Sequence, residues 1–217
     1  MCGRYVFVSE PQELRTDFPD LEILSNLPPR TNISPGMVVN VIRIKESMQL
    51  VPMQWGLIPS WAKDHSSTFK TFNARSETVT EKPTFRIPFK RKRCLIPANG
   101  FYEWRTEGKK KFPHLFFPSN GKHLYFAGLY DEWESPNGYL ESCTVLTTSA
   151  NETLSVVHDR MPVFLDKAKF PLWLSKDSSE KDLLPLLKPA PSDFLQTKEV
   201  LAVREGIDPF GKSGELF

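Results

Sequence analysis

The sequence has few cysteines, almost no excess of charge of either sign, and no long hydrophobic run. No segment approaches the roughly 18 apolar residues of a membrane-spanning helix, and no charged start leads into the apolar core of a signal peptide. We therefore expect a cytoplasmic protein that does not enter a membrane. Basic residues number 28 and acidic residues 26, so the formal net charge is +2. A broadly basic surface is excluded, and any polyanion must be bound by a local patch.

The three cysteines are Cys2, Cys94 and Cys143, far apart in the sequence. An odd number of widely spaced cysteines fits neither a disulfide framework nor a CxxC zinc site. We expect free thiols in a reducing compartment, with Cys94 and Cys143 buried because each stands in an apolar context. No cofactor and no metal ion are expected.

Proline, by contrast, is abundant at 19 of 217 residues, and 40% of the residues are hydrophobic. The apolar content suffices for a core, whereas proline spread along the chain favours short elements joined by shaped loops. Because no repeat, low-complexity tract or linker divides the sequence, we expect a single domain over residues 1–217.

Short segments rich in aromatic and β-branched residues predict a strand-rich core. Turn signals at Glu107-Gly108, Asn120-Gly121 and Asn137-Gly138 separate several of them, and we interpret residues 94–148 as an antiparallel meander. Prolines bracket a predicted loop between residues 28 and 36. The predicted strands are Val38–Ile44, Gln49–Trp55, Cys94–Ile96, Phe101–Arg105, Phe112–Phe117, His123–Tyr130 and Tyr139–Thr148.

Helices are expected to be few and short. Ser9 and Gln12 have the spacing of a capping box, which predicts a helix through Leu14 to Phe18. Asp166–Leu174 and Ser179–Leu187 also have helical patterns, ended by prolines. The predicted fold class is α+β, with a barrel-like, mostly antiparallel β core flanked by short helices.

Cys2 is the most informative residue for chemistry. Removal of the initiator methionine leaves an α-amine and a thiol on the same residue, with ordinary pKa values of about 8 and 8.5. Such an aminothiol suits an aldehyde: the amine condenses to an imine, and the thiolate then closes a five-membered thiazolidine ring. An internal cysteine cannot do this, because its nitrogen belongs to a peptide bond. Position alone, however, favours an incidental second residue.

Six short motifs place Cys2 in a specific context. They are Met-Cys-Gly-Arg-Tyr at residues 1–5, Asn32-Ile-Ser-Pro-Gly36, Trp55-Gly-Leu-Ile-Pro-Ser-Trp61, Asn73-Ala-Arg-Ser-Glu-Thr78, Arg93-Cys-Leu-Ile-Pro-Ala-Asn-Gly-Phe-Tyr-Glu-Trp104 and His158-Asp-Arg-Met-Pro162. In this order they resemble the SOS-response-associated peptidase family, whose members shield abasic sites in single-stranded DNA. The resemblance is strong over residues 2–165, and residues 166–217 are less typical.

The resemblance implies both a fold and a function. The fold is an α+β domain whose barrel-like sheet carries a positively charged groove. The function is a thiazolidine crosslink between Cys2 and the ring-opened sugar aldehyde of an abasic site, within the DNA damage response. The word peptidase in the family name fits the removal of Met1, which either the protein itself or a housekeeping aminopeptidase would carry out. The implied partner is single-stranded DNA containing abasic sites, and we expect a monomer.

The resemblance assigns catalytic roles to Cys2, Asn73, Glu103 and His158. Cys2 is the nucleophile, and Glu103 senses the abasic site and moves protons near the Cys2 amine; an aromatic-rich setting would raise its pKa. Strand alternation puts Glu103 on the same face as Phe101. His158 donates a proton to the sugar oxygen or stabilises the crosslink, unless it is a structural corner. Asn73 positions the amine or the substrate, with a helix cap as its rival role.

The DNA-binding residues implied by the resemblance are three arginines, two apolar side chains and one threonine. Arginine forks suit phosphate oxygens, and apolar side chains stack on bases without sequence preference. Two basic runs, Lys90–Arg93 and Lys109–Lys111, are expected to be solvated surface instead. The predicted DNA-binding residues are Arg4, Pro35, Trp61, Arg75, Thr147 and Arg160.

Two other functions stay open. An N-terminal-nucleophile thiol hydrolase or peptidase would use the Cys2 amine as its base and turn over an amide. A plain single-strand binding module would hold intact and abasic strands alike. The segment Val200–Gly206 lacks an asparagine common near the end of family members, and one wall of the DNA groove is therefore expected to differ.

Overall fold

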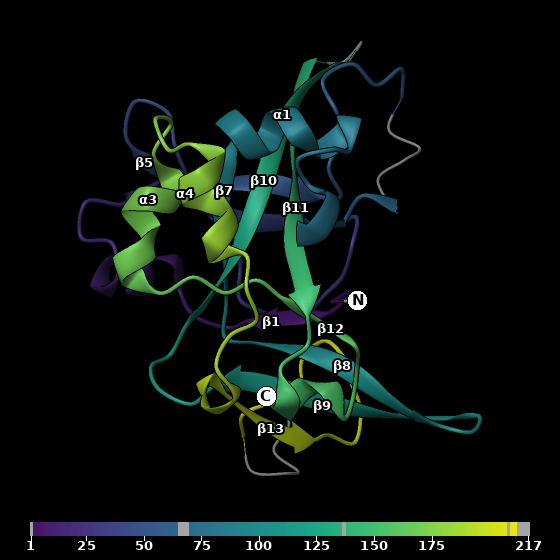
Figure 1. Ribbon diagram of the computed structural model, residues 1–217. Coiled ribbons are helices and arrows are strands. Elements are labelled where there is room, and N and C mark those ends of the chain that lie inside the picture. Colours follow the sequence, from purple (N-terminus) through teal and green to yellow (C-terminus); the bar gives the residue numbers. More distant parts are fainter. Residues whose placement is uncertain (1, 65–69, 136–137, 208, 212–217) are drawn as a thin grey trace.

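The computed structural model describes residues 2–64, 70–135, 138–207 and 209–211. The strands form two sheets, seen one above the other in Figure 1. In chain order the strands are β1 (Tyr5–Phe7), β2 (Glu22–Ile23), β3 (Arg30–Ile33), β4 (Val38–Ile44), β5 (Met48–Trp55), β6 (Asn73–Arg75), β7 (Arg93–Ala98), β8 (Gly100–Glu107), β9 (Lys110–Pro118), β10 (Leu124–Ser135), β11 (Gly138–Ser149), β12 (Arg160–Pro162) and β13 (Leu195–Glu199).

The larger sheet closes on itself as a barrel. Its wall runs in the order β5-β4-β7-β10-β11, with antiparallel neighbours. β11 then returns to β5 in parallel, with Ser142 opposite Gln54 and Cys143 opposite Trp55. Side chains from these strands, such as Trp55 and Phe126, are fully buried inside. The predicted α+β fold with a barrel-like, mostly antiparallel core is therefore confirmed, and Cys94 and Cys143 are buried free thiols as expected.

The second sheet carries the N-terminal strand. Its order is β13-β9-β8-β1-β3, and all its pairs are antiparallel. Alternation sends Tyr5 and Phe101 into the main core, while Val6 and Tyr102 join a smaller apolar cluster. β1 runs between the barrel above it and the β8–β9 hairpin below it (Figure 1). The residues before β1 therefore enter at the junction of the two sheets.

The helices are short, as expected. The helical patterns over Asp166–Leu174 and Ser179–Leu187 are confirmed, and Ser179 forms a capping box with Asp182. No described helix is long and apolar enough to cross a membrane. The helices are η1 (Pro11–Thr16), η3 (Ser76–Thr78), α1 (Pro83–Arg91), α2 (Glu152–Ser155), η4 (Lys167–Lys169), α3 (Phe170–Leu174), α4 (Glu180–Leu183), η5 (Leu184–Leu186) and η6 (Ser192–Phe194), where η marks a 3-10 helix.

The predicted meander is wrong in its connections. β8–β9 and β10–β11 are antiparallel hairpins, but they belong to different sheets, and β7 pairs with β10 rather than with β8. Local turn signals do not reveal which distant strand a segment will join, and this choice is made by burial of the apolar faces. The Glu107-Gly108 turn is confirmed, with Gly108 at a positive φ of 59°, whereas Asn137 lies outside the described residues.

Two predictions near the N-terminus also need correction. The segment predicted as a loop between residues 28 and 36 contains β3, which pairs with β1. The first helix is a 3-10 helix whose capping box is formed by Glu10 and Glu13, not by Ser9 and Gln12. Ser9 does not cap this helix because it is buried, and its hydroxyl accepts a hydrogen bond from the Asn99 side-chain amide instead.

The basic run Lys90–Arg93 is solvated surface only in part, because Lys90 and Arg91 are exposed whereas Lys92 is half-buried and Arg93 is buried. Arg93 is buried, and its guanidinium donates to the carbonyl oxygens of Phe89, Trp173 and Ser175. Lys90 and Lys92 pair with acidic side chains of α4 and β10. The run therefore ties α1 to its neighbours. The second run, Lys109–Lys111, is exposed as expected.

Gly100, where β8 begins beside β1, has no room for a side chain. A Cβ atom there would lie 2.7 Å from the backbone carbonyl oxygen of Phe116. Gly100→Ala is expected to lower the free energy of unfolding by about 2–3 kcal/mol, because that backbone belongs to a central strand pair. Urea denaturation measures this. Thr106→Ala, at an exposed position of the same strand, is the control and should stay within about 0.5 kcal/mol; an equally small change for Gly100→Ala would contradict the packing described.

Candidate active site

Strand pairing gathers many of the predicted site residues near the N-terminus. β6 runs parallel to β11, with Asn73 opposite Val145 and Arg75 opposite Thr147. β12 pairs with β11 in the antiparallel sense, with Pro162 opposite Thr147. Thr147 therefore stands between the segment that carries Asn73 and the segment that carries His158.

Cys2 is buried, and no part of its surface is exposed (0%). Asn73 lies against its backbone: the Asn73 side-chain amide donates a hydrogen bond of 2.8 Å to the Cys2 carbonyl oxygen. The pKa of the Cys2 thiol is raised, first by burial and then by the negative charge of Glu103, and a hydrogen bond from the Arg4 backbone opposes this. The thiol therefore keeps its proton until a neighbouring group accepts it.

Glu103 lies inside the protein, with 3% of its surface exposed. The pairing of Tyr5 with Phe101 and the hydrogen bond from Tyr102 N–H to Arg4 carbonyl oxygen set the register of β1 and β8. Continued in this register, Gly3 stands opposite Glu103, one residue from Cys2. Burial raises the pKa of Glu103 to about 7. A carboxylic acid with this pKa both takes up and gives up a proton at neutral pH.

His158 lies in the turn before β12, with 26% of its side chain exposed. Its Nδ1 is 2.9 Å from the Arg160 backbone nitrogen and also 2.9 Å from an oxygen of Asp159. The two contacts need opposite protonation of Nδ1. The Arg160 backbone N–H cannot release its proton, so this contact requires Nδ1 to be the acceptor. The Asp159 side chain is 86% exposed and is solvated by water instead. We therefore assign the ring proton of His158 to Nε2. Burial, as the largest cause, lowers the pKa of His158, which favours this neutral form.

Arg160 and Thr147, both predicted to bind DNA, are bound to each other. Arg160 Nη2 donates to the Thr147 carbonyl oxygen at 2.7 Å, and its two terminal nitrogens also contact the carboxylate of Glu77 at 2.6 and 2.9 Å. The Thr147 hydroxyl is buried beside them and 3.5 Å from the Ala74 carbonyl oxygen. The two terminal nitrogens of the Arg160 guanidinium, which could otherwise bind a phosphate, thus already have protein partners.

The other predicted DNA-binding residues are more accessible. Arg75 is exposed and Arg4 is half-buried. Trp61, in the segment after β5, is 66% exposed, as a base-stacking side chain must be. Pro35 lies in the turn between β3 and β4 and is half-buried. No described contact joins Pro35 or Trp61 to the cluster around Cys2.

Two acidic residues next to predicted site residues were missed. Glu77 stands inside the Asn73-Ala-Arg-Ser-Glu-Thr78 motif, but the motif alone does not show that it binds Arg160, 83 residues away. Asp159 adds to the rise in the pKa of Glu103 through its negative charge. Both contacts depend on tertiary structure, so spacing in the sequence could not reveal them.

The atypical C-terminal segment lies on the free edge of β3. The Glu205 carboxylate accepts hydrogen bonds from the backbone N–H groups of Thr31 and Asn32, at 3.4 and 3.2 Å. The Gly206 N–H donates to the Thr31 hydroxyl at 2.9 Å. This segment therefore covers the strand whose following turn carries Pro35.

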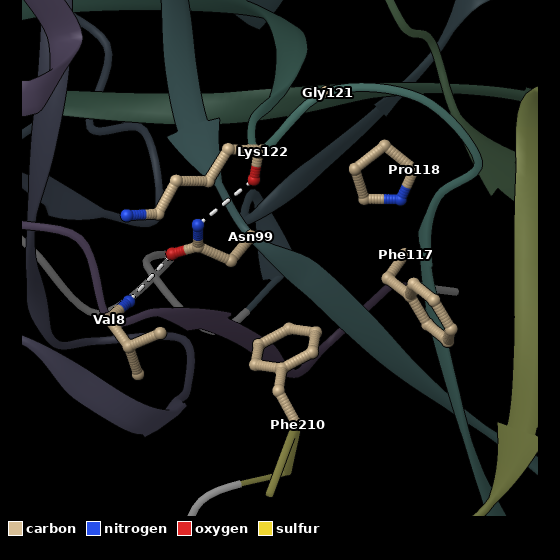
Figure 2. A pocket seen from close by; sticks show the side chains of 7 residues that line it. All are labelled: Val8, Asn99, Phe117, Pro118, Gly121, Lys122 and Phe210. Carbon is tan, nitrogen blue, oxygen red and sulfur yellow. Dashed lines mark hydrogen bonds between the residues drawn. The ribbon is translucent and has the colours of Figure 1, made fainter.

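A cavity of about 340 Å³ lies away from this cluster, and none of the predicted site residues lines it. Figure 2 shows the Asn99 amide at one end, bonded to the Val8 N–H and to the Lys122 carbonyl oxygen, with Phe117 and Phe210 on the apolar side. Its lining offers no titratable group beyond Lys122, whose ammonium pairs with Glu13. The described residues likewise include no group of three histidine, cysteine or acidic side chains that could hold a metal ion.

Fold and cluster together define a class: a mixed β-barrel protein with a cysteine at the second position, held beside a buried glutamic acid, an asparagine and a nearby neutral histidine. The sequence matches the SOS response associated peptidase (SRAP) family over residues 1–203. The chain belongs to this family, as the motifs predicted.

Relatives match along nearly the whole chain. The abasic site processing protein YoqW of Bacillus subtilis is 38% identical over 206 residues, which is 92% of each chain. The abasic site processing protein YoaM of the same organism is 37% identical over 223 residues, covering 100% of this chain and 97% of YoaM. A crystal structure of a Bacteroides thetaiotaomicron protein superimposes with a TM-score of 0.85 over 92% of both chains at 24% identity, and so supports the fold.

The raised pKa of Glu103 predicts a pH-dependent stability. The folded protein holds this proton to about pH 7, against an ordinary value of 4.5, so stability falls as pH rises through this window. Glu103→Gln, which stays neutral, is expected to be more stable than the wild type by on the order of 1–3 kcal/mol at pH 8, and nearly equal to it at pH 4.5. Urea denaturation at both pH values measures the difference. A wild type that is the more stable at pH 8 would show that Glu103 is not a strained buried acid.

Proposed function

We propose that the protein crosslinks itself to abasic sites in single-stranded DNA through Cys2 and thereby shields the lesion. The observation that carries this proposal is the burial of Glu103, with a pKa near 7, beside Cys2. The names of the relatives YoqW and YoaM, which describe abasic site processing, support the same substrate. A DNA-damage role follows from that substrate.

The reaction begins once Met1 has been removed and the Cys2 amine is free. The amine attacks the sugar aldehyde, and loss of one water gives an imine. The Cys2 sulfur then adds to the imine carbon while its proton moves to the nitrogen, which closes the thiazolidine. Each step moves a proton to or from Cys2, and Glu103 is the neighbouring group whose pKa allows it to carry that proton in both directions at neutral pH.

Asn73 and His158 complete the site in this proposal. Asn73 holds the Cys2 carbonyl through Nδ2, while its Oδ1 is buried and has no hydrogen-bond partner in the described part of the chain. A buried acceptor of this kind calls for a donor, and the freed α-amine of Cys2, on the residue that Asn73 already contacts, would supply one. His158, with its proton on Nε2, donates to the sugar oxygen released as the deoxyribose ring opens.

DNA is held by a small set of side chains. Arg75 and Arg4 bind phosphates, and Trp61 and Pro35 stack against bases or wedge between them. Arg160 and Thr147 border the same region, where Arg160 keeps its contacts with Glu77. We propose that one chain suffices as a monomer, because the cluster around Cys2 is drawn from a single chain.

The aminothiol requirement is testable with single substitutions at Cys2. Untagged wild type is expected to form an adduct with an abasic single strand, one water lighter than the sum of both masses, in intact mass spectrometry. Cys2→Ser keeps the amine but lacks the thiol, so its imine should be captured only when borohydride is added. Residues added ahead of Cys2 should abolish the stable adduct. A stable adduct of normal yield from Cys2→Ser would contradict the proposal, and amide turnover without DNA would favour a hydrolase.

The role of Glu103 predicts a pH profile. The crosslinking rate of the wild type should rise as the Glu103 carboxylate forms, with an inflection near pH 7. Glu103→Gln should be slower by about 100-fold and should keep only the inflection of the amine, at about 8. Single-turnover rates between pH 5.5 and 9 on the same abasic oligonucleotide measure this. An unchanged profile in Glu103→Gln would remove Glu103 from the mechanism.

A further inference from the structure

An ion pair joins the segment that carries Asn73 to the segment that carries His158. Glu77 lies in η3, directly after β6, and both its carboxylate oxygens accept hydrogen bonds from the terminal nitrogens of Arg160, at 2.6 and 2.9 Å. The Arg160 side chain is 14% exposed and that of Glu77 50%. A bidentate pair fixes both the place and the plane of a guanidinium, which a single contact does not.

Arg160 in turn fixes the turn that holds His158. Its Nη2 donates to the Thr147 carbonyl oxygen at 2.7 Å, and the Ala150 N–H donates to the Asp159 carbonyl oxygen at 3.0 Å. The Arg160 backbone N–H then donates to Nδ1 of His158 at 2.9 Å. This last bond selects the tautomer of neutral His158 whose proton is on Nε2.

We propose that Glu77 is a positioning residue for the crosslinking reaction, acting through Arg160 on His158. The inference rests on the proposed function for its consequence in catalysis. Without the Glu77 carboxylate, Arg160 loses its bidentate anchor and its side chain keeps only the contacts with Thr147. The turn is then held less firmly, and the hydrogen bond from the Arg160 N–H to Nδ1 weakens. Neutral His158 then populates both tautomers, and a smaller fraction of molecules presents the Nε2 proton. No described hydrogen bond or ion pair joins Glu77 to Cys2, and its side-chain partners are Arg160 and Ser76.

A different role for the pair gives the opposite result for DNA affinity. If Glu77 only occupied Arg160 until a phosphate displaced it, removing the carboxylate would free a cation and tighten binding to any single strand. Binding would also become steeper in salt by one phosphate contact. In the positioning role, affinity for an intact strand changes little while the crosslinking rate falls. Rate and affinity measured on the same variants therefore separate the two.

The test compares Glu77→Gln with Glu81→Gln in the untagged, full-length protein. Glu81 is exposed, lies in the turn that follows η3, and loses the same charge when changed to glutamine. We expect Glu77→Gln to crosslink a saturating abasic strand about tenfold more slowly, and Glu81→Gln at the wild-type rate. Affinity for an intact strand, measured across salt concentrations, should stay within about twofold. The ring carbon and nitrogen shifts of His158 in NMR spectra should show mixed tautomers only in Glu77→Gln.

Several outcomes would overturn the inference. One is a Glu77→Gln variant with the wild-type rate and a single His158 tautomer, and another is tighter, more salt-dependent binding to intact strands. Should Glu77→Gln fail to fold, Glu77→Asp replaces it. This variant keeps the charge, but its side chain is one methylene shorter and its carboxylate no longer reaches both terminal nitrogens of Arg160. The same slow rate and mixed tautomers are expected. If the wild type itself forms no adduct, the proposed function fails, and the His158 spectra alone still decide whether Glu77 orders that residue.

Discussion

The site depends on one unfavourable arrangement: a carboxylic acid buried beside a buried thiol. Glu103 has 3% and Cys2 0% of its surface exposed. Burial raises the pKa of both groups, and the negative charge of Glu103 makes ionisation of the Cys2 thiol harder still. The barrel and the second sheet together enforce this, because β1 is paired with β8 and leads the N-terminus along it. A pKa near 7 for Glu103 is the direct result. The same burial that destabilises the fold at neutral pH gives the proposed reaction a group, Glu103, that acts both as an acid and as a base near neutral pH.

Around this pair, the neighbouring strands supply the remaining groups in fixed positions. Asn73 on β6 is tied to the Cys2 backbone, and His158 is oriented by the backbone of β12. The ion pair between Glu77 and Arg160 links these two segments across β11. The groups that we propose for catalysis thus come from separate parts of the chain, and each is positioned by an extended strand or by the residue next to one, so their separations are set by sheet geometry.

Much of this could be predicted from local pattern. The residue pattern predicts strand Val38–Ile44 with the bounds that the structure has, and alternation along β8 predicts Glu103 on the same face as Phe101. The chemistry of a second-position cysteine also follows from the residue itself. Most of what failed was long-range: which hairpin joins which sheet, the strand Arg30–Ile33 that pairs with β1, and the burial of Arg93 by carbonyl groups about 80 residues away. The capping box of Glu10 and Glu13 is a local exception. The ion pair of Arg160 with Glu77 belongs to the same group, since its partner is chosen by the fold rather than by spacing.

The central claim is that nitrogen and sulfur of one terminal residue together hold the sugar. Tandem mass spectrometry of the nuclease- and protease-digested adduct tests it most directly. The account predicts a sugar remnant on Cys2, with the residue resistant both to thiol alkylation and to labelling of its amine. A remnant on a lysine, or on Cys2 with either its thiol or its amine still reactive, would contradict it.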